Sequence, residues 1–254
     1  MDIRKSLTTQ NNPTAKKGDL AQSLRRSVAP AQGTGLAKPD ARTALPTDYK
    51  GGGAIGYIID ATGSRQSTWA QAQTIQRTMF DNVKSMGAMQ LRLIHFGGGE
   101  LKDLGWKQDP AAVASAMSAV ECESGGTQIN EALRRFADNA APPKADSIIL
   151  IGDAFEEFDD EAFTLAKKLA DQRIKIFAFH EGTNSSSEQT FRELARITGG
   201  AFAKFGPNMP LKDLCNAVAV YSVGGAGALS RLASSGDRAA KQLSQSTLKL
   251  TGPK

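Results

Sequence analysis

The chain has 254 residues, of which 40% are hydrophobic and 22% are charged. This composition is typical of a globular protein with a sizeable core, and it excludes a wholly disordered chain. The net charge is +5, but residues 1–50 hold nine basic and four acidic side chains, whereas residues 51–254 hold 22 of each. A neutral body argues against a large basic face for nucleic acid.

Cysteine usage and the N-terminal residues indicate a compartment. Cys122 and Cys215 are too few for a disulfide framework and lack the spacing of zinc ligands, so we interpret them as small buried residues in a reducing environment. Residues 1–20 lack the apolar core of a secretory signal, and no segment has the apolar length that spans a membrane. We therefore expect a cytoplasmic protein with no membrane or nucleic-acid partner.

Composition divides the chain into three regions. Residues 1–53 are rich in Gln, Asn, Thr, Pro, Lys and Gly, and we predict a flexible basic tail there. Residues 54–222 form the predicted folded domain. Residues 223–254 begin with a glycine-rich stretch and carry scattered leucines, so we predict a C-terminal appendage that is partly helical or disordered.

Short apolar runs alternate with helical stripes along the predicted domain. Buried strands are predicted at residues 54–59, 91–96, 147–151, 174–179 and 201–205, with a short edge strand at 100–108. Apolar residues at helical spacing predict helices within 69–86, 113–120, 129–140, 162–169, 191–198 and 211–221. This alternation predicts a doubly wound α/β fold, with a mainly parallel sheet and helices on both faces.

Three loops of this predicted sheet carry side chains with oxygen atoms. Because ligands of such sheets lie beyond the carboxyl ends of the strands, these loops are where a site is expected. Asp60, Thr62 and Ser64 occupy alternate residues after the first strand, Thr127 follows two glycines where a helix is predicted to begin, and Asp153 follows the most apolar strand. Two carboxylates and three hydroxyls suit a hard divalent cation such as Mg²⁺. With only two anionic ligands, the ion would still attract an incoming carboxylate.

Taken singly, three of these residues have a simpler interpretation. Asp60, Thr127 and Asp153 are residue types that cap helix N-termini, and each precedes a predicted helix. The metal-site prediction therefore depends on all five residues occurring together in the predicted strand context.

The DxTxS run, the later Thr at a helix start and the Asp after a further strand resemble the metal-ion-dependent adhesion site (MIDAS) of von Willebrand factor type A (vWA) domains. The resemblance spans about residues 54–222 and implies the Rossmann-like vWA fold. It also implies that Asp60, Thr62, Ser64, Thr127 and Asp153 hold the ion, directly or through water. Mg²⁺ is the expected ion, with Mn²⁺ and Ca²⁺ as alternatives.

The resemblance further implies a non-catalytic adaptor for protein–protein interaction. A partner protein would supply an Asp or Glu to the metal, and similar cytoplasmic domains often serve larger assemblies, including ATPase machines. Two departures from the family's pattern occur. Thr62 stands where Ser is commoner, which keeps the hydroxyl, and Arg65 follows the motif where the family often carries an apolar residue.

Charged residues near the predicted site also have structural interpretations. Arg65 reads most simply as a solvated helix residue, and His95 and His180, near strand ends, as packed, hydrogen-bonded histidines. The acidic run at 156–161 is predicted to begin a helix, where the helix dipole favours carboxylates. It would also make the metal rim negative and favour partners with basic or mixed-charge surfaces.

An enzyme is the alternative prediction. Asp60 after a buried strand also resembles the nucleophile of haloacid-dehalogenase-type phosphatases, with Asp153 and Glu157 holding Mg²⁺. That family places a second acid two residues after the nucleophile, where this chain has Thr62. Thr62 is unsuited to that proton transfer, and the Gly-Gly-Thr127 segment has no role in such an enzyme.

Overall fold

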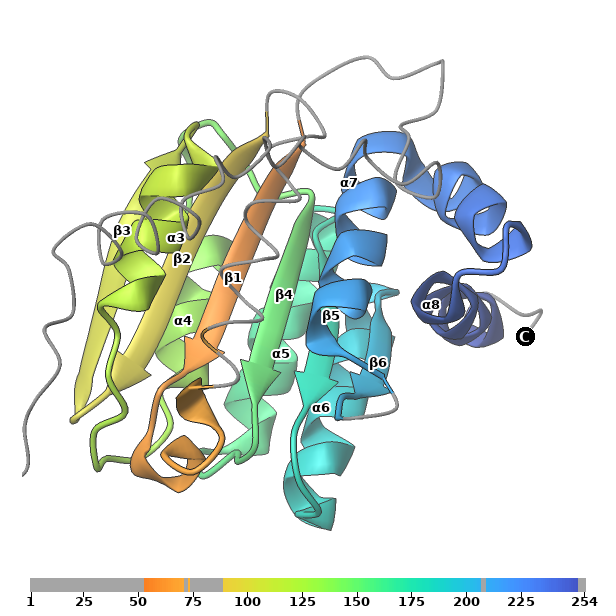
Figure 1. Ribbon diagram of the computed structural model, residues 1–254. Coiled ribbons are helices and arrows are strands. Elements are labelled where there is room, and N and C mark those ends of the chain that lie inside the picture. The colour runs from red at the N-terminus through yellow and green to blue at the C-terminus, as the bar shows by residue number, and fades with distance from the viewer. Residues whose placement is uncertain (1–52, 71–72, 74–88, 207–208, 251–254) are drawn as a thin grey trace, which may run out of the picture. The chain divides into compact units, whose positions relative to one another are not determined.

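The computed structural model describes residues 53–70, 73, 89–206 and 209–250. Within them, six strands form one sheet in the order β3-β2-β1-β4-β5-β6 (Figure 1). Their bounds are β1 Ala54–Asp60, β2 Gln90–Gly97, β3 Glu100–Lys107, β4 Ser147–Gly152, β5 Lys175–His180 and β6 Ala201–Lys204. The edge strand β3 pairs antiparallel with β2, and every other pairing is parallel. The predicted fold class, a mainly parallel doubly wound α/β sheet, is confirmed.

The central strands are apolar along most of their length because they are buried on both faces of the sheet. All seven residues of β1 are buried, because helices cover both faces of the sheet at this strand. Side chains alternate between two cores along each strand: Tyr57 and Ile59 face one core, and Ile58 faces the other. The same alternation continues in the neighbouring strand β4, so a single sheet separates the two cores.

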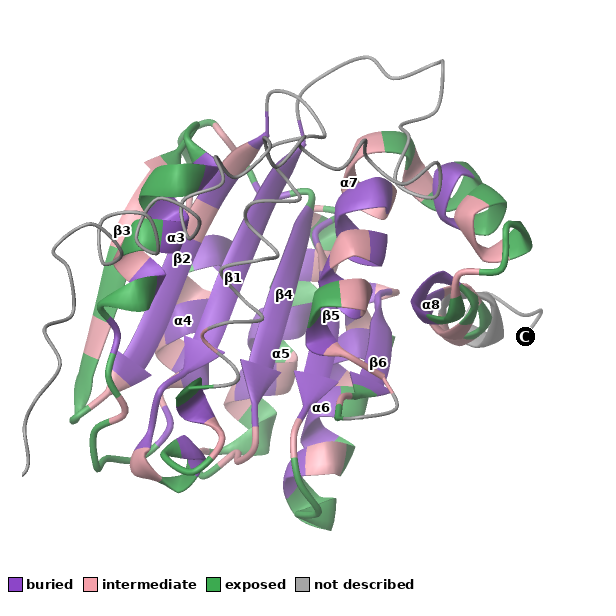
Figure 2. Cartoon of the chain, viewed as in Figure 1, coloured by how far each residue is buried: buried purple, intermediate pink, exposed green. Residues whose placement is uncertain are grey.

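Helices are divided between the two faces of the sheet, as Figures 1 and 2 show. α3 (Pro110–Ser118) and α7 (Leu211–Ser234) contribute buried residues to one core. α4 (Ile129–Ala137), α5 (Asp159–Asp171) and α6 (Ser185–Thr198) contribute to the other. This arrangement leaves the carboxyl ends of the parallel strands open at one edge of the sheet, where the loops after β1, β4 and β5 lie.

The C-terminal helices run past the boundary predicted at residue 222. α7 continues to Ser234 through a break at Gly225, whose φ of 65° and ψ of −166° are not helical. The following helix α8 (Arg238–Leu250) packs against α7 and the edge strand β6. Leu229 and Leu243 are buried in the same core as the sheet residues. The described part of residues 223–254 is thus mostly helical, and it contributes to the domain core.

Some predicted regions lie outside the described residues. The predicted tail, 1–53, lies outside them except for Gly53, and so does most of the helix predicted within 69–86. The helix predicted over 129–140 ends earlier, at Ala137, where Asp138 is the C-cap. Among the described helices, none is long and apolar enough to cross a membrane.

Candidate metal site

The loop after β1 is shaped by the side chain of Asp60, the last residue of the strand. The Asp60 carboxylate accepts a hydrogen bond from the backbone N–H of Thr62 at 2.8 Å, which turns the chain immediately after the strand. A short 3-10 helix, η2 (Gly63–Arg65), follows this turn. It brings the Thr62 and Ser64 hydroxyl oxygens to 3.1 Å from each other. The alternate spacing of the three residues therefore places their oxygens in one cluster.

Asp153 joins this cluster from the neighbouring strand. β1 and β4 are parallel partners with Ile59 opposite Ile151, so the two strands end side by side. The Ser64 hydroxyl donates to Asp153 Oδ1 at 3.1 Å, across 89 residues of sequence. Four of the five residues predicted to hold the metal, namely Asp60, Thr62, Ser64 and Asp153, are therefore connected by hydrogen bonds.

Asp60 is fully buried, and its second carboxylate oxygen, Oδ2, has no hydrogen-bond partner among the described residues. Burial raises the pKa of Asp60 to about 6; hydrogen bonds from Thr62 and the charge of Arg65 oppose this shift, and the nearby Asp153 carboxylate adds to it. A buried carboxylate oxygen without a donor is costly unless something binds it. A cation would remove that cost and lower the pKa of Asp60.

Thr127 has different partners. Its hydroxyl accepts from the Glu156 backbone N–H at 3.0 Å, and its own N–H donates to the Glu156 carboxylate at 3.3 Å. Among the described residues, no hydrogen bond joins Thr127 to the other four predicted ligands. α4 begins two residues later, at Ile129, with Gln128 as its N-cap. Thr127 is thus held against the loop after β4, and its role as a ligand stays a prediction.

Arg65 is not the solvated helix residue that the sequence suggested, because it is only 1% exposed. Its Nη1 donates to the Asp60 backbone carbonyl at 2.5 Å, and its Nε donates to Glu181 at 3.1 Å. Its guanidinium also lies 5.3 Å from the Trp69 ring centroid. Since Arg65 and Glu181 are 116 residues apart, local sequence carries no signal of this pairing. Arg65 therefore connects the end of β1, where the candidate site lies, to the residue that follows β5.

The two histidines occupy different surroundings. His180 is buried at the end of β5, with its Nε2 3.1 Å from the Asp153 carbonyl oxygen and its ring against Phe191. Burial lowers the pKa of His180. His180 thus fits the packed, hydrogen-bonded interpretation, whereas His95 on β2 has no hydrogen-bond partner among the described residues and lines a pocket.

The acidic run divides into two parts. Only residues 159–161 lie in the first turn of α5, because the helix begins at Asp159 with Phe158 as its N-cap. Glu157 instead reaches the start of α4, where its two carboxylate oxygens accept from the backbone N–H groups of Ile129 at 2.5 Å and Asn130 at 2.9 Å. This carboxylate caps a helix that begins 28 residues earlier in the chain.

The chemistry of this cluster fits a hard divalent cation. No group of three or more His, Cys, Asp or Glu residues in the described part of the chain could hold a metal. The cluster instead combines two carboxylates with two hydroxyls, and a hydroxyl oxygen can offer a lone pair while its hydrogen points elsewhere. The unpartnered Asp60 Oδ2 supplies the buried negative charge. Oxygen-only donors favour Mg²⁺, Mn²⁺ or Ca²⁺ over softer metals.

Comparison with known proteins agrees with this fold. Residues 56–156, which include Asp60, Thr127 and Asp153, match the von Willebrand factor type A domain. The matched segment runs from β1 into the loop after β4. The described sheet and helices have the Rossmann-like fold of vWA domains. No curated protein sequence matches this chain.

Solved structures of low sequence identity share the fold. BatB from Bacteroides thetaiotaomicron is 15% identical, with a TM-score of 0.54, covering 72% of this chain and 99% of that chain. The SpRpn10 VWA domain is 15% identical, with a TM-score of 0.51, covering 63% and 92%. Proximal thread matrix protein 1 from the mussel byssus, solved with a zinc-occupied MIDAS motif, is 16% identical, with a TM-score of 0.53, covering 68% and 46%.

Proposed function

We propose that this chain is a vWA-type protein-interaction module that binds a partner carboxylate through a divalent cation. Mg²⁺ is the proposed ion, held by Asp60, Thr62, Ser64, Thr127 and Asp153, directly or through water. The observation that carries the proposal is the buried Asp60 Oδ2, which lacks a hydrogen-bond partner among the described residues and belongs to the cluster with Thr62, Ser64 and Asp153. The zinc-occupied MIDAS of the mussel protein supports a cation at this position of the fold.

The charges of the cluster explain why a partner would complete it. Two carboxylates do no more than balance the charge of a divalent ion, and the hydroxyls add no charge, so a position left open in the coordination shell can take one more anionic oxygen. An Asp or Glu side chain from a partner would supply that oxygen. The affinity of the partner would depend on the metal, because without the ion the partner's carboxylate would be repelled by the Asp153 carboxylate.

The setting of this interaction is part of the proposal. Cys122 and Cys215 are free thiols, which suits a reducing cytoplasm. We propose an adaptor in a larger assembly, since a partner bound at the carboxyl-end edge of the sheet would leave the rest of the surface available.

Calorimetric and thermal-shift titrations with Mg²⁺ test the metal site. Wild type should bind and be stabilised, whereas Asp60→Ala should lose at least about 100-fold in affinity, because it removes the buried anionic ligand. Asp171→Asn is the matched control, since this carboxylate is exposed at the end of α5. Equal Mg²⁺ affinity of wild type and Asp60→Ala would contradict the proposal.

A second titration tests the carboxylate. N-acetyl-glutamate amide should bind in the presence of Mg²⁺ and not in the presence of a chelator, and N-acetyl-glutamine amide should bind in neither. An aryl phosphate assay on the same samples tests the enzyme alternative. Asp60-dependent hydrolysis would support the phosphatase and overturn the adaptor.

A further inference from the structure

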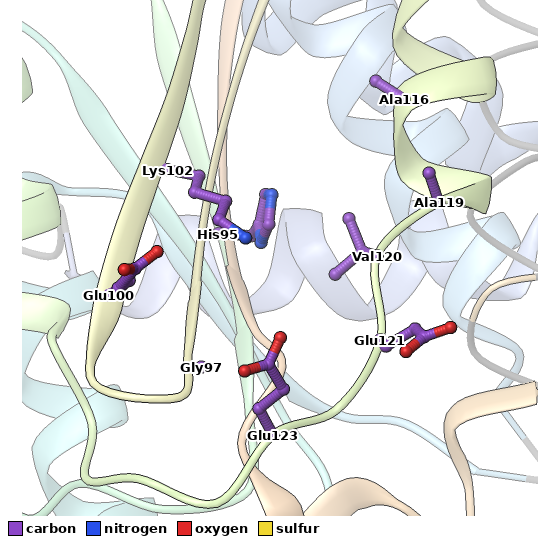
Figure 3. A pocket seen from close by; sticks show the side chains of 9 residues that line it. All are labelled: His95, Gly97, Glu100, Lys102, Ala116, Ala119, Val120, Glu121 and Glu123. Atoms are coloured by element: carbon purple, nitrogen blue, oxygen red, sulfur yellow. The ribbon is translucent and has the colours of Figure 1, made fainter.

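A pocket of about 340 Å³ lies between the β2–β3 hairpin and the chain that follows α3. Ala116, Ala119 and Val120 give it an apolar wall on the α3 side, and His95 faces Val120 across the space (Figure 3). Figure 3 also shows the Glu123 carboxylate pointing into the pocket toward His95. The pocket thus combines an apolar wall with polar groups opposite it.

His95 is an unpartnered polar side chain that faces this pocket. The residue is only 9% exposed, and its ring has no hydrogen-bond partner among the described residues. Burial lowers the pKa of His95, and the nearby Lys102 lowers it further, which favours the neutral ring. A neutral imidazole has one nitrogen that accepts a hydrogen bond. The pocket therefore contains a nearly buried hydrogen-bond acceptor, the His95 ring, which a donor group of a ligand can reach.

The charged groups of the pocket favour a cation. Three carboxylates line it, those of Glu100, Glu121 and Glu123, and none forms an ion pair within the described part of the chain. Lys102 is the one cationic side chain among the lining residues, so the pocket carries a formal charge of about −2 with His95 neutral. Glu121 points away from His95 in Figure 3 and lies at the rim. An anionic ligand would meet this net negative charge.

The position of Glu123 is fixed by the backbone around it. Its N–H donates to the Ala61 carbonyl at 3.1 Å, and its carbonyl accepts from the Gly98 N–H at 3.4 Å. A Cβ on Gly98, whose φ is +63°, would lie 2.3 Å from Glu123 Oε2, so the hairpin turn approaches the carboxylate closely. Glu123 also forms a backbone bridge with Thr62. The pocket and the candidate metal site are therefore adjacent on one face.

We infer that this pocket binds an arginine side chain of the same protein partner that reaches the metal. The placement of the partner rests on the proposed function, but the chemistry of the pocket needs no metal. A guanidinium has several donors in one plane, so it can serve Glu123 and the His95 acceptor together. The aliphatic stem packs on Ala116, Ala119 and Val120.

NMR titration with N-acetyl-arginine amide, without metal, tests the pocket itself. We expect saturable shifts at His95, Gly97 and Glu123, with a dissociation constant on the order of 1 mM for so small a ligand. The citrulline analogue has nearly the same shape without the charge and should bind at least about 10-fold more weakly, because it lacks a charge-assisted hydrogen bond. Equal binding of the two analogues, or shifts confined to another surface, would overturn the inference.

Three variants sharpen this test. Glu123→Gln and Glu100→Gln should each raise the dissociation constant of the arginine analogue about 5-fold, whereas the control Asp171→Asn should leave it unchanged. Glu100 is exposed and forms no ion pair with a described residue, so its substitution is not expected to disturb folding. Unchanged binding by both glutamate variants would overturn the inference.

A peptide arm separates this inference from the proposed function. Peptides that carry both Arg and Asp, at several spacings, should bind wild type in Mg²⁺ more tightly than peptides with Arg alone, because the second contact is intramolecular. Asp60→Ala should abolish that gain and keep the binding of N-acetyl-arginine amide. If wild type binds Mg²⁺ but not N-acetyl-arginine amide, the arginine pocket is refuted and the proposed function is not. If peptides with both Arg and Asp bind no more tightly than peptides with Arg alone, the inference that one partner occupies both the pocket and the metal is overturned.

Discussion

Arg65 and Asp60 are linked by a hydrogen bond to the backbone: Arg65 Nη1 donates to the Asp60 carbonyl oxygen at 2.5 Å. The same guanidinium pairs with Glu181 at 3.1 Å, so it connects the end of β1 to the residue that follows β5. The Arg65 side chain is 0% exposed and that of Glu181 is 22% exposed. The arginine is thus a buried strut beneath the loop that carries the candidate ligands.

Replacing Arg65 by Met should destabilise the fold by about 3 kcal/mol, because it leaves a partly buried Glu181 carboxylate and the Asp60 carbonyl without a donor. The double variant R65M/E181Q should recover part of this loss. Chemical denaturation of the purified variants measures both values. Arg135→Met is the control, since that arginine is half exposed and its helix pair with Glu131 is worth about 0.5 kcal/mol. Equal losses at positions 65 and 135 would contradict the buried-strut role.

The stability of the metal-free protein should depend on pH through Asp60. Its folded pKa of about 6 lies above the ordinary value of 3.8 for an aspartate, so the folded state holds this proton more tightly than the unfolded chain does. The resulting stabilisation is complete below pH 4 and is lost as the pH rises to about 6, a change of about 3 kcal/mol. Asp60→Asn has no such carboxyl and should avoid this loss.

The measurement is the difference in unfolding free energy between Asp60→Asn and wild type, without metal, from pH 4 to pH 7. This difference should increase with pH, because wild type loses stability and Asp60→Asn does not. Saturating Mg²⁺ should then restore the unfolding free energy of wild type at pH 7 and leave that of Asp60→Asn unchanged. A difference that stays constant with pH would show that burial does not disfavour the Asp60 carboxylate.

Gly97 allows β2 to approach the site loop. A Cβ at this position would lie 2.5 Å from the Ala61 carbonyl oxygen, and Ala61 lies between two predicted ligands, Asp60 and Thr62. Gly97→Ala should therefore displace the loop, cost about 2 kcal/mol of stability and weaken Mg²⁺ binding. Gly206→Ala is the control, because a Cβ there meets nothing within 4 Å. Thermal melts and Mg²⁺ titration of both variants decide whether the close approach matters.

The part of the site that could be predicted is the part built from loops at strand ends. A strand buried on both faces is an uninterrupted apolar run, so its carboxyl end is visible in the sequence. Since parallel strands end at one edge of the sheet, Asp60 at the end of β1 and Asp153 directly after β4 are expected to lie together there. Ser64 connects them in the structure. The order of the strands was not needed for this inference, only their direction.

Contacts between distant side chains could not be predicted in the same way. The pairing of Arg65 with Glu181 depends on β5 lying two strands from β1, which no local pattern reveals. The glycine-rich start of the predicted appendage disfavours a helix by intrinsic propensity, yet α7 passes through it with one break at Gly225. Packing of the C-terminal helices on the core outweighs that propensity.

Glu157 should behave as a helix cap and not as part of a binding rim. Its carboxylate accepts from two backbone N–H groups at the start of α4, so Glu157→Ala should cost about 1–2 kcal/mol of stability. Chemical denaturation measures this loss, and Asp160→Asn, an exposed carboxylate in the same acidic run, should cost less than about 1 kcal/mol.

A test of the negative rim therefore needs selected residues. Asp159 accepts from the Thr190 hydroxyl at 2.7 Å, and Glu161 pairs with Arg134, so neutralising them would disturb internal contacts. Glu156 is also kept, because its carboxylate accepts from the N–H of the proposed ligand Thr127. Asp160→Asn removes one exposed charge and keeps all these contacts, so it should weaken the binding of basic peptides and leave Mg²⁺ affinity unchanged. A parallel loss of Mg²⁺ affinity would mean that the rim acts on the metal itself.

The C-terminal helices should prove to be part of the cooperative unit. Leu243 on α8 is 0% exposed and lies in the same core as β-sheet residues such as Ile149 and Phe177. Leu243→Ala should cost about 3 kcal/mol and lower the Tm by about 6–12 °C, because a buried cavity replaces the side chain. Leu232→Ala, at a half-buried position on α7, should cost less. If residues 223–254 were a separable appendage, Leu243→Ala would leave the main transition unchanged, and calorimetry would resolve a second, earlier transition that alone responds to the substitution.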